Sequence, residues 1–185
     1  VVRRYAARKP AAPLARFLPR LTELAAHHDD STAGLYGFPA AWRKAAADPL
    51  MRAAQDEVSD ELYYLPAMKL AGELGLARAF SRAALYEAAI QHGLGDDPDG
   101  LPAMAGRASA AAKPPAGGGD ERAWLGEFLK VRLATLQHAS DPATAAAWAE
   151  SAGRAEAMLK IFDSGNMDLE GPLKVAPYGD SFTIP

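Results

Sequence analysis

Residues 85–101 read LYEAAIQHGLGDDPDGL, the pattern of a helix followed by a tight loop. We expect the helix over residues 76–91, because Gly93 follows it and glycine is the usual residue just past a helix C-terminus. At about 100° per residue, Glu87 falls at the centre of the apolar stripe of this helix. An isolated buried charge is costly, so Glu87 is expected to have a partner of opposite charge.

A second helix offers that partner. It is expected to begin after Asp120, a favourable N-cap, and to run to about residue 138. Arg132 falls in the middle of its apolar stripe, and a guanidinium keeps its proton under ordinary conditions. We therefore expect Glu87 to pair with Arg132, with Arg154 as a second partner from the last helix. Periodicity alone leaves open whether this pair serves a site or only fixes helix register.

The rest of the chain is expected to consist of helices and loops. Further helices are expected over residues 1–8, 13–26, 48–65, 66–75 and 142–163. Pro19 should kink the second of these or open a new turn. Loops are expected over residues 27–39 and over residues 113–120, the latter as a flexible linker, and the tail from Gly165 should be extended. These ranges predict a mainly α fold, with a single domain over residues 1–185 and no sizeable sheet.

Composition excludes several classes of function. The 185 residues are 49% hydrophobic and 23% charged, which is typical of a soluble globular protein. A net charge of −3 gives no basic field for nucleic acid or anionic lipid, and no apolar run is long enough to span a bilayer. The chain has no cysteine, no glycine-rich phosphate loop and no signal peptide, so we expect no disulfide and no cofactor.

Other candidate residues have simpler interpretations. Residues 27–30, HHDD, have the side chains of metal ligands, but adjacent side chains diverge, so a solvated loop and no metal site is expected. The tryptophans are expected in the core rather than as platforms for sugars: Trp42, Trp124 and Trp148. The aspartates of the 85–101 stretch can be turn residues: Asp96, Asp97 and Asp99. His92 can be a cation that favours the helix C-terminus.

Several segments resemble one enzyme family. YEAAIQHGLGDDP is similar to the YYDAxxxHGxGxDP segment of the chitosanases of glycoside hydrolase family 46, with Glu87 where that family has aspartate. LARFLPRLTEL, FPAAWRKAAADP, GGGDERAWLGEFLKVRLA and GNMDLEGPLKVAPYGDSFTI resemble further segments of the same family. The last two are long and specific, and the likeness extends over the whole chain.

The resemblance implies a fold and an activity. The family has a mostly helical, two-lobed, lysozyme-like fold, and its members are secreted enzymes that hydrolyse the β-1,4 bonds of chitosan with inversion. Their catalytic glutamate lies on an N-terminal helix and their catalytic aspartate in a small β-lobe. By this likeness both would precede Val1, so the helix and the β-lobe are expected to be absent and the chain alone is expected to be inactive.

The resemblance also implies site residues. Glu87 and Arg132 match a buried network that holds the catalytic glutamate, and Arg154 matches a second arginine of that network. Glutamate in place of aspartate adds a methylene that should shift the network. His92 matches a histidine of the cleft, and Asp96 is expected to line the cleft, where an acidic group suits an aminosugar. The implied partners are chitosan or glucosamine oligosaccharides.

Two alternatives stay open at this point. The chain could be a module that binds chitosan oligomers without cutting them, which would show as weak, saturable binding without turnover. It could also be an all-helical domain that senses a small apolar ligand. That second alternative requires a DNA-binding module elsewhere, because nothing in this chain is basic enough.

Overall fold

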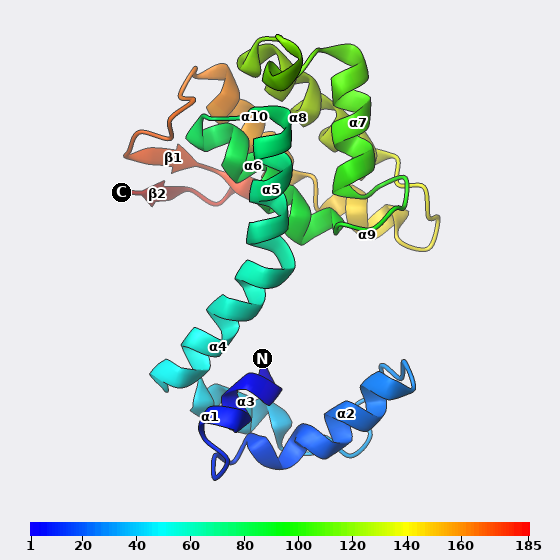
Figure 1. Cartoon of the computed structure of the whole chain (residues 1–185), viewed down its shortest axis with the longest axis vertical. Helices are drawn as coiled ribbons and strands as arrows, with labels where there is room; N and C mark the ends of the chain where they lie inside the picture. Colours follow the sequence, from blue (N-terminus) through cyan, green and yellow to red (C-terminus); the bar gives the residue numbers. More distant parts are fainter. The chain divides into compact units, whose positions relative to one another are not determined.

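The protein is mainly α, as predicted from its sequence. The computed structural model describes residues 1–185 (Figure 1). Besides helices it contains one sheet of two short strands, β1 (Leu173–Val175) and β2 (Phe182–Ile184), so the prediction of no sizeable sheet is confirmed. The chain forms two compact units, residues 1–62 and residues 63–185, each described separately below. The single domain predicted over residues 1–185 stays a prediction.

Unit 1 is helical throughout. Its elements are α1 (Val2–Arg8), the 3₁₀ turn η1 (Ala15–Phe17), α2 (Leu18–Ala26), α3 (Phe38–Ala45) and α4 (Pro49–Ser59). Pro19 lies in the first turn of α2, so it opens a new helix, one of the two outcomes predicted for it. Helix α3 was not predicted. It begins at Phe38, directly after Gly37, whose φ is positive at 80°, so the loop predicted over residues 27–39 ends two residues earlier than expected.

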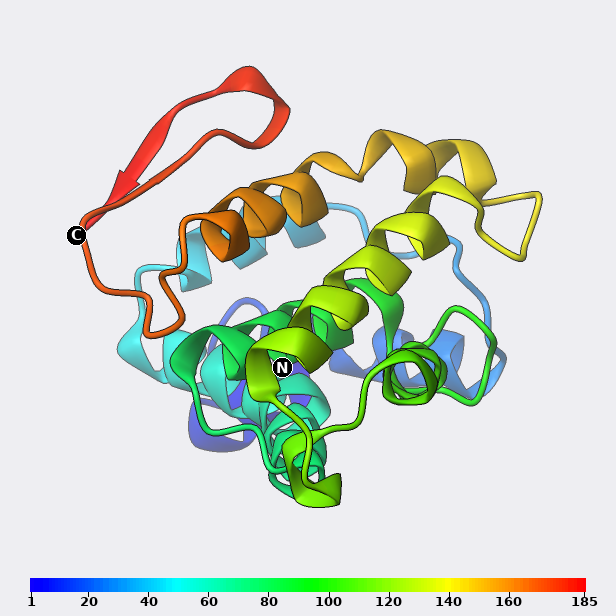
Figure 2. The same cartoon turned by 90° about the horizontal axis from the view of Figure 1, so that it is seen from above.

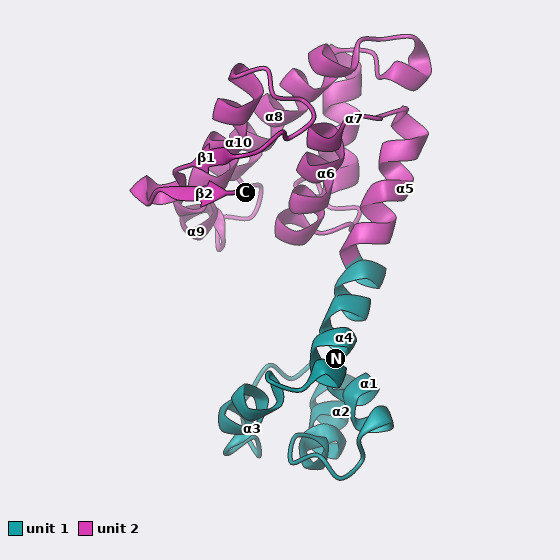
Figure 3. Ribbon diagram, turned by 90° about the vertical axis from the view of Figure 1, so that its left-hand side faces the viewer, with its two compact units in different colours: residues 1–62 teal, residues 63–185 magenta.

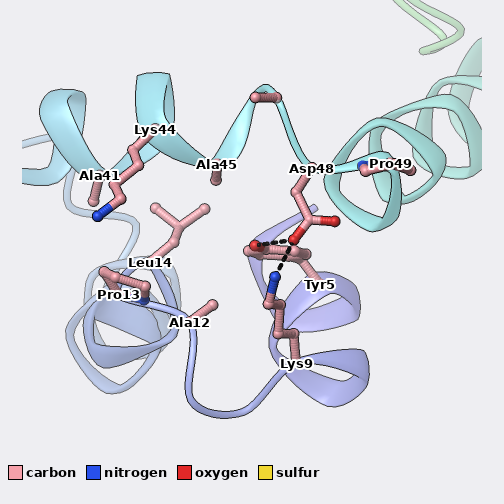
Figure 4. A pocket seen from close by; sticks show the side chains of 11 residues that line it. Tyr5, Lys9, Ala12, Pro13, Leu14, Ala41, Lys44, Ala45, Asp48 and Pro49 are labelled. Carbon is pink, nitrogen blue, oxygen red and sulfur yellow. Dashed lines mark hydrogen bonds and ion pairs between the residues drawn. The ribbon is translucent and has the colours of Figure 1, made fainter.

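Asp48 ties the elements of unit 1 together. As N-cap of α4, its Oδ1 accepts a hydrogen bond from the Leu50 amide at 3.0 Å. Its Oδ2 accepts from the Tyr5 hydroxyl at 3.0 Å and contacts the Lys9 ammonium (Figure 4). The Lys9 contact, followed by the Leu50 amide, holds the pKa of Asp48 below its ordinary value. Beside these groups lies a pocket of about 430 Å³ that also contains Lys44.

The chain enters unit 2 through a π-helical turn. This turn, η2 (Asp60–Tyr64), lies between α4 and α5 (Leu65–Leu74) in the sequence. Pro66, which cannot donate an amide hydrogen bond, lies in the first turn of α5, directly after this π-helical turn. Helix α5 ends at Gly75 with a left-handed φ of 75°, as predicted.

Unit 2 is built around two pairs of packed helices that are neighbours in the sequence. Its other helices are α6 (Ala79–His92), α7 (Leu101–Ala111), η3 (Pro115–Gly117), α8 (Glu121–Gln137), α9 (Ala145–Glu150) and α10 (Gly153–Asp163). Helices α5 and α6 pack together, α7 packs on α8, and α8 contacts α9 and α10 (Figure 3). The rings of Trp124 and Phe128 stack at 5.3 Å in the core. The Trp124 side chain is fully buried, as predicted.

Two sequence expectations differ from unit 2. Helix α7 was not predicted, and the last helix predicted over residues 142–163 is divided into α9 and α10 by a turn at Ser151 and Ala152. Helix α6 begins at Ala79 rather than Leu76. The amides of Ala77 and Arg78 instead donate to the Glu121 carboxylate, at 3.1 and 2.9 Å, from the first turn of α8.

The tail folds back over the helices of unit 2. The Phe80 amide of α6 donates to the carbonyl of Met167 at 2.9 Å, and Arg78 forms an ion pair with Asp168 at 2.6 Å. The strands β1 and β2 then pair antiparallel, with Leu173 opposite Ile184. Figure 2 shows this hairpin in red, turning back beside α10. The connection between the strands, η4 (Pro177–Gly179), packs on α10.

The glycine-rich segment before α8 is a hydrogen-bonded turn, and the predicted flexible linker is wrong in this respect. The amides of Gly117 and Gly119 donate to the carbonyl of Pro114, at 2.8 and 3.0 Å. A Cβ at Gly119 would lie 1.8 Å from the carbonyl oxygen of Lys113, whereas a Cβ at Gly117 would meet only Pro114 Cδ at 3.8 Å. The turn therefore requires glycine at position 119 but not at position 117.

We predict that Gly119→Ala lowers the free energy of unfolding by about 1–3 kcal/mol, because backbone must move to admit the methyl group. Gly117→Ala is the matched control and should change that free energy by less than about 0.5 kcal/mol. Urea unfolding followed by circular dichroism measures both. Equal stabilities of the two variants would contradict the close approach at Gly119.

Candidate active site

The buried face of α6 is not the one that the sequence predicted. The buried side chains of this helix are Phe80, Ser81, Ala84, Leu85, Ala88, Ala89 and His92. Ile90, although apolar, is 43% exposed, and Glu87 lies beside the buried face with 18% of its side chain exposed. The prediction that Glu87 occupies the centre of the buried face is therefore wrong. Arg132 is different, since it lies in the middle of the buried face of α8 and is fully buried.

Glu87 nevertheless has both of its predicted partners. One carboxylate oxygen contacts Nη2 of Arg132 and the other contacts Nη2 of Arg154. Neither carboxylate oxygen is accessible to solvent. Helices α6, α8 and α10 each supply one residue of this group, which we call the Glu87 cluster: Glu87, Arg132 and Arg154. The predicted ion pairs are confirmed.

Arg132 is surrounded by polar atoms although it lies in the core. Besides Glu87, its guanidinium donates to Oε1 of Gln91 and contacts Sδ of Met158 at 3.2 Å. Its Nε–H faces Nε2 of His92 at 3.5 Å, a long contact. Burial lowers the pKa of Arg132, and the negative charge of Glu87 acts in the opposite direction. Glu87 is thus the charge that compensates the buried guanidinium.

His92 is part of the core and not of the exposed surface. The residue is only 6% exposed, and its ring meets that of Trp148 edge to face at 5.1 Å. Its Nδ1 lies 3.1 Å from the carbonyl oxygen of Asp99. Because a carbonyl can only accept, Nδ1 carries the proton and Nε2 faces Arg132 with its lone pair. Burial first, and the charge of Arg132 second, lower the pKa of His92 to about 4.

The three aspartates after α6 have different surroundings. Asp99 is buried, and its Oδ2 accepts from both the amide and the hydroxyl of Ser140, each at 2.7 Å. Asp97 accepts from the amide of Asp99 at 3.1 Å, the turn interaction expected for it. Asp96 is exposed. Asp97 is exposed as well, but one of its oxygens is taken by this turn bond, so Asp96 is the exposed carboxylate that remains for the predicted sugar contact.

The structure brings two further residues to the Glu87 cluster that the sequence did not single out. Gln91 lies one helical turn after Glu87 and joins Arg132 to the hydroxyl of Ser151, which its Nε2 reaches at 2.8 Å. The spacing of four residues on one helix face could have indicated Gln91. Nothing in the sequence could have indicated Ser151, because it is polar, near no motif and 60 residues away.

The Glu87 cluster can hold and orient a negative group. It contains two guanidiniums and one carboxylate, and the Arg154 side chain is 44% exposed, so it can donate to a further oxygen atom. No group of three or more histidine, aspartate or glutamate side chains converges as it would around a metal ion, residues 27–30 included. None of the helices has the length and apolar character that crossing a membrane requires.

We predict that Glu87→Ala lowers the free energy of unfolding by about 3–5 kcal/mol, because it leaves the buried guanidinium of Arg132 without a carboxylate. Arg154→Ala is the control, since it removes a half-exposed partner of the same carboxylate and should cost at most about 1 kcal/mol. Urea denaturation of the purified variants measures both. A Glu87→Ala variant as stable as Arg154→Ala would show that Arg132 does not depend on Glu87.

We also predict that His92 makes the fold less stable in mild acid. Its pKa is about 4 when folded and about 6.5 when unfolded, so in this range the unfolded chain binds the extra proton. Stability should fall by about 2–3 kcal/mol as the pH drops from 6.5 to 4, and this loss should level off below pH 4. The His92→Gln variant should not show this loss of stability in acid, whereas the His27→Gln variant, altered in an exposed loop, should still show it. The free energy of unfolding is measured across this pH range. If the His92→Gln variant lost as much of it between pH 6.5 and 4 as the unaltered chain does, His92 would not be the group responsible.

Comparison with known proteins identifies a family and several similar proteins. The family model described as glycosyl hydrolase family 46 matches residues 1–173. The chain is 42% identical over 176 residues to a chitosanase of Bacillus subtilis (strain 168), and 34% identical over 185 residues to one of Streptomyces sp. (strain N174). These matches cover 95% and 100% of this chain but 64% and 63% of the relatives, so the chain spans less than two thirds of their length.

Solved structures of chitosanases have a similar fold. The chain is similar to the chitosanase of Gynuella sunshinyii in complex with chitotetraose, with a TM-score of 0.91 and 46% identity over 100% of this chain and 76% of that one. It is also similar to a mutant chitosanase of Bacillus subtilis MY002 complexed with six glucosamine units, with a TM-score of 0.92 and 40% identity over 100% and 77% of the two chains. The family model over residues 1–173 and these relatives show that the chain belongs to glycosyl hydrolase family 46.

Proposed function

We propose that this chain is the substrate-binding and positioning part of an inverting hydrolase that cuts β-1,4 linkages within chitosan. The observation that carries the proposal is the Glu87 cluster, a buried carboxylate between two arginines in a chain whose relatives are chitosanases. Such a cluster holds its guanidiniums in fixed places, and the exposed side of Arg154 is available to orient one more carboxyl group.

Inversion needs two carboxyl groups about 6.5–9.5 Å apart, one as acid and one as base. Glu87 is held by two arginines and Asp99 by Ser140, so neither is free to exchange a proton with a sugar. We therefore propose a positioning role for Glu87, and we propose that the acid and the base are the glutamate and the aspartate that the resemblance to the family implies. Chitosan is a polymer, which supports an extracellular site of action.

Substrate binding is proposed for the loop after α6. Chitosan carries ammonium groups, and Asp96 is an exposed carboxylate that can pair with one of them. His92 is proposed to act through this loop rather than on the sugar directly, because its ring is buried and bonded to the carbonyl of Asp99. The loop is anchored a second time by Arg107, which donates to the carbonyl of Pro98 at 2.6 Å.

One observation favours a second candidate, binding without hydrolysis by these 185 residues. The two carboxylates that the site buries, Glu87 and Asp99, are both engaged by other side chains, so the site itself offers no proton donor. General acid catalysis typically contributes about 10²- to 10⁴-fold to a rate, so hydrolysis without it falls toward background.

We predict that the 185-residue chain binds a glucosamine hexamer weakly and saturably and does not release reducing ends above background. Asp96→Asn should weaken binding by about 3-fold or more, and added salt should reduce this difference, because an ion pair is lost. Asp30→Asn, in an exposed loop of unit 1, is the control. Binding is measured by titration calorimetry and cleavage by a reducing-end assay, with a chitosanase as reference. Turnover comparable to that of the reference would mean that two carboxylates within residues 1–185 perform the reaction.

A further inference from the structure

Tyr178 has a strained backbone that its own packing does not explain. Its φ of 55° lies in the left-handed region, which side chains other than glycine rarely adopt. Such a conformation persists only where the surrounding structure holds it, and it is more frequent at functional sites. Tyr178 is 60% exposed, so burial of its ring in the core is not what holds it.

Two specific contacts hold Tyr178 in place. Its ring packs against Gly153, the first residue of α10, since a Cβ there would lie 2.7 Å from two ring carbons. Its hydroxyl donates to the carbonyl of Ser151 at 2.9 Å. Both contacts fall on residues 151–153, the junction between α9 and α10. The tail of the chain is therefore fastened to this junction through one side chain.

The junction leads to the Glu87 cluster by two routes. Arg154 lies directly after Gly153, in the first turn of α10, so the place of the junction sets the place of its guanidinium. The hydroxyl of Ser151 donates to the carbonyl of Trp148 at 2.7 Å and accepts from Gln91, which in turn accepts from Arg132. Each route ends at a guanidinium that contacts Glu87.

We propose that Tyr178 is a positioning residue of this enzyme, which sets the two arginines of the Glu87 cluster through the α9–α10 junction. The inference rests on the proposed function, in which the Glu87 cluster orients a catalytic carboxyl group. In this role the hydroxyl of Tyr178 controls the geometry of the Glu87 cluster, whereas a purely structural anchor would need only the ring and its contact with Gly153.

Tyr178→Phe separates these two roles, because it keeps the ring and removes only the hydroxyl. We expect a folded chain in which the Nε–H resonances of Arg132 and Arg154 shift in ¹⁵N NMR spectra, together with the titration midpoint of His92. Gly153→Ala, which displaces the ring, should shift the same resonances further. Tyr36→Phe is the matched control, since Tyr36 is 98% exposed and the same chemical change there should leave the resonances in place.

Unchanged arginine resonances in Tyr178→Phe would overturn the proposal, and so would failure of this variant to fold, because positioning requires an intact fold. In the protein that hydrolyses chitosan, kcat of Tyr178→Phe should fall about 2- to 10-fold with KM little changed, as expected for one lost neutral hydrogen bond. Absence of hydrolysis in a longer protein that joins these 185 residues to the family's catalytic glutamate and aspartate would refute the proposed function, while the NMR comparison would still decide the role of Tyr178.

Discussion

The full burial of the Arg132 guanidinium is the constraint on which much of unit 2 depends. A guanidinium keeps its proton, so its charge must be met by the fold. Three neighbours on one helix meet it: Glu87 supplies the charge, and Gln91 and His92 supply lone pairs. Helix α6 therefore has to present its last two turns to α8 in a single register. Helix α10 joins the same contact through Arg154, which pairs with Glu87.

The surroundings of Arg132 also decide the state of His92. A second positive charge beside the guanidinium would be repelled, and burial disfavours it further, so the ring is neutral. The neutral ring has one proton to place, and the carbonyl of Asp99 fixes it on Nδ1. The geometry of the loop after α6 thus follows from the charge in the core, because the same Asp99 is bonded through its side chain to Ser140.

A buried charge could be predicted from the sequence, whereas a helix of small residues and contacts between distant residues could not. The Glu87–Arg132 pair was predictable because an unpaired charge on an apolar stripe is chemically forced to find a partner. The predicted buried face of this helix was nevertheless wrong for Glu87, because Leu76 lies outside α6 and small residues such as Ala84 and Ala88 form much of the face that is buried. Helix α7 has the sequence LPAMAGRASAA, whose small residues give little contrast between faces. Gln91, Ser151 and Tyr178 are joined only by the tertiary structure, and no local pattern connects them.

The start of α6 has a consequence for the order in which unit 2 can fold. The amides of Ala77 and Arg78 are satisfied by Glu121, 44 and 43 residues further along the chain, and not by a local cap. Closing a loop of this length costs chain entropy before any contact offsets it. The entry into α6 is therefore fixed only once α8 has docked, so this part of unit 2 depends on a non-local contact.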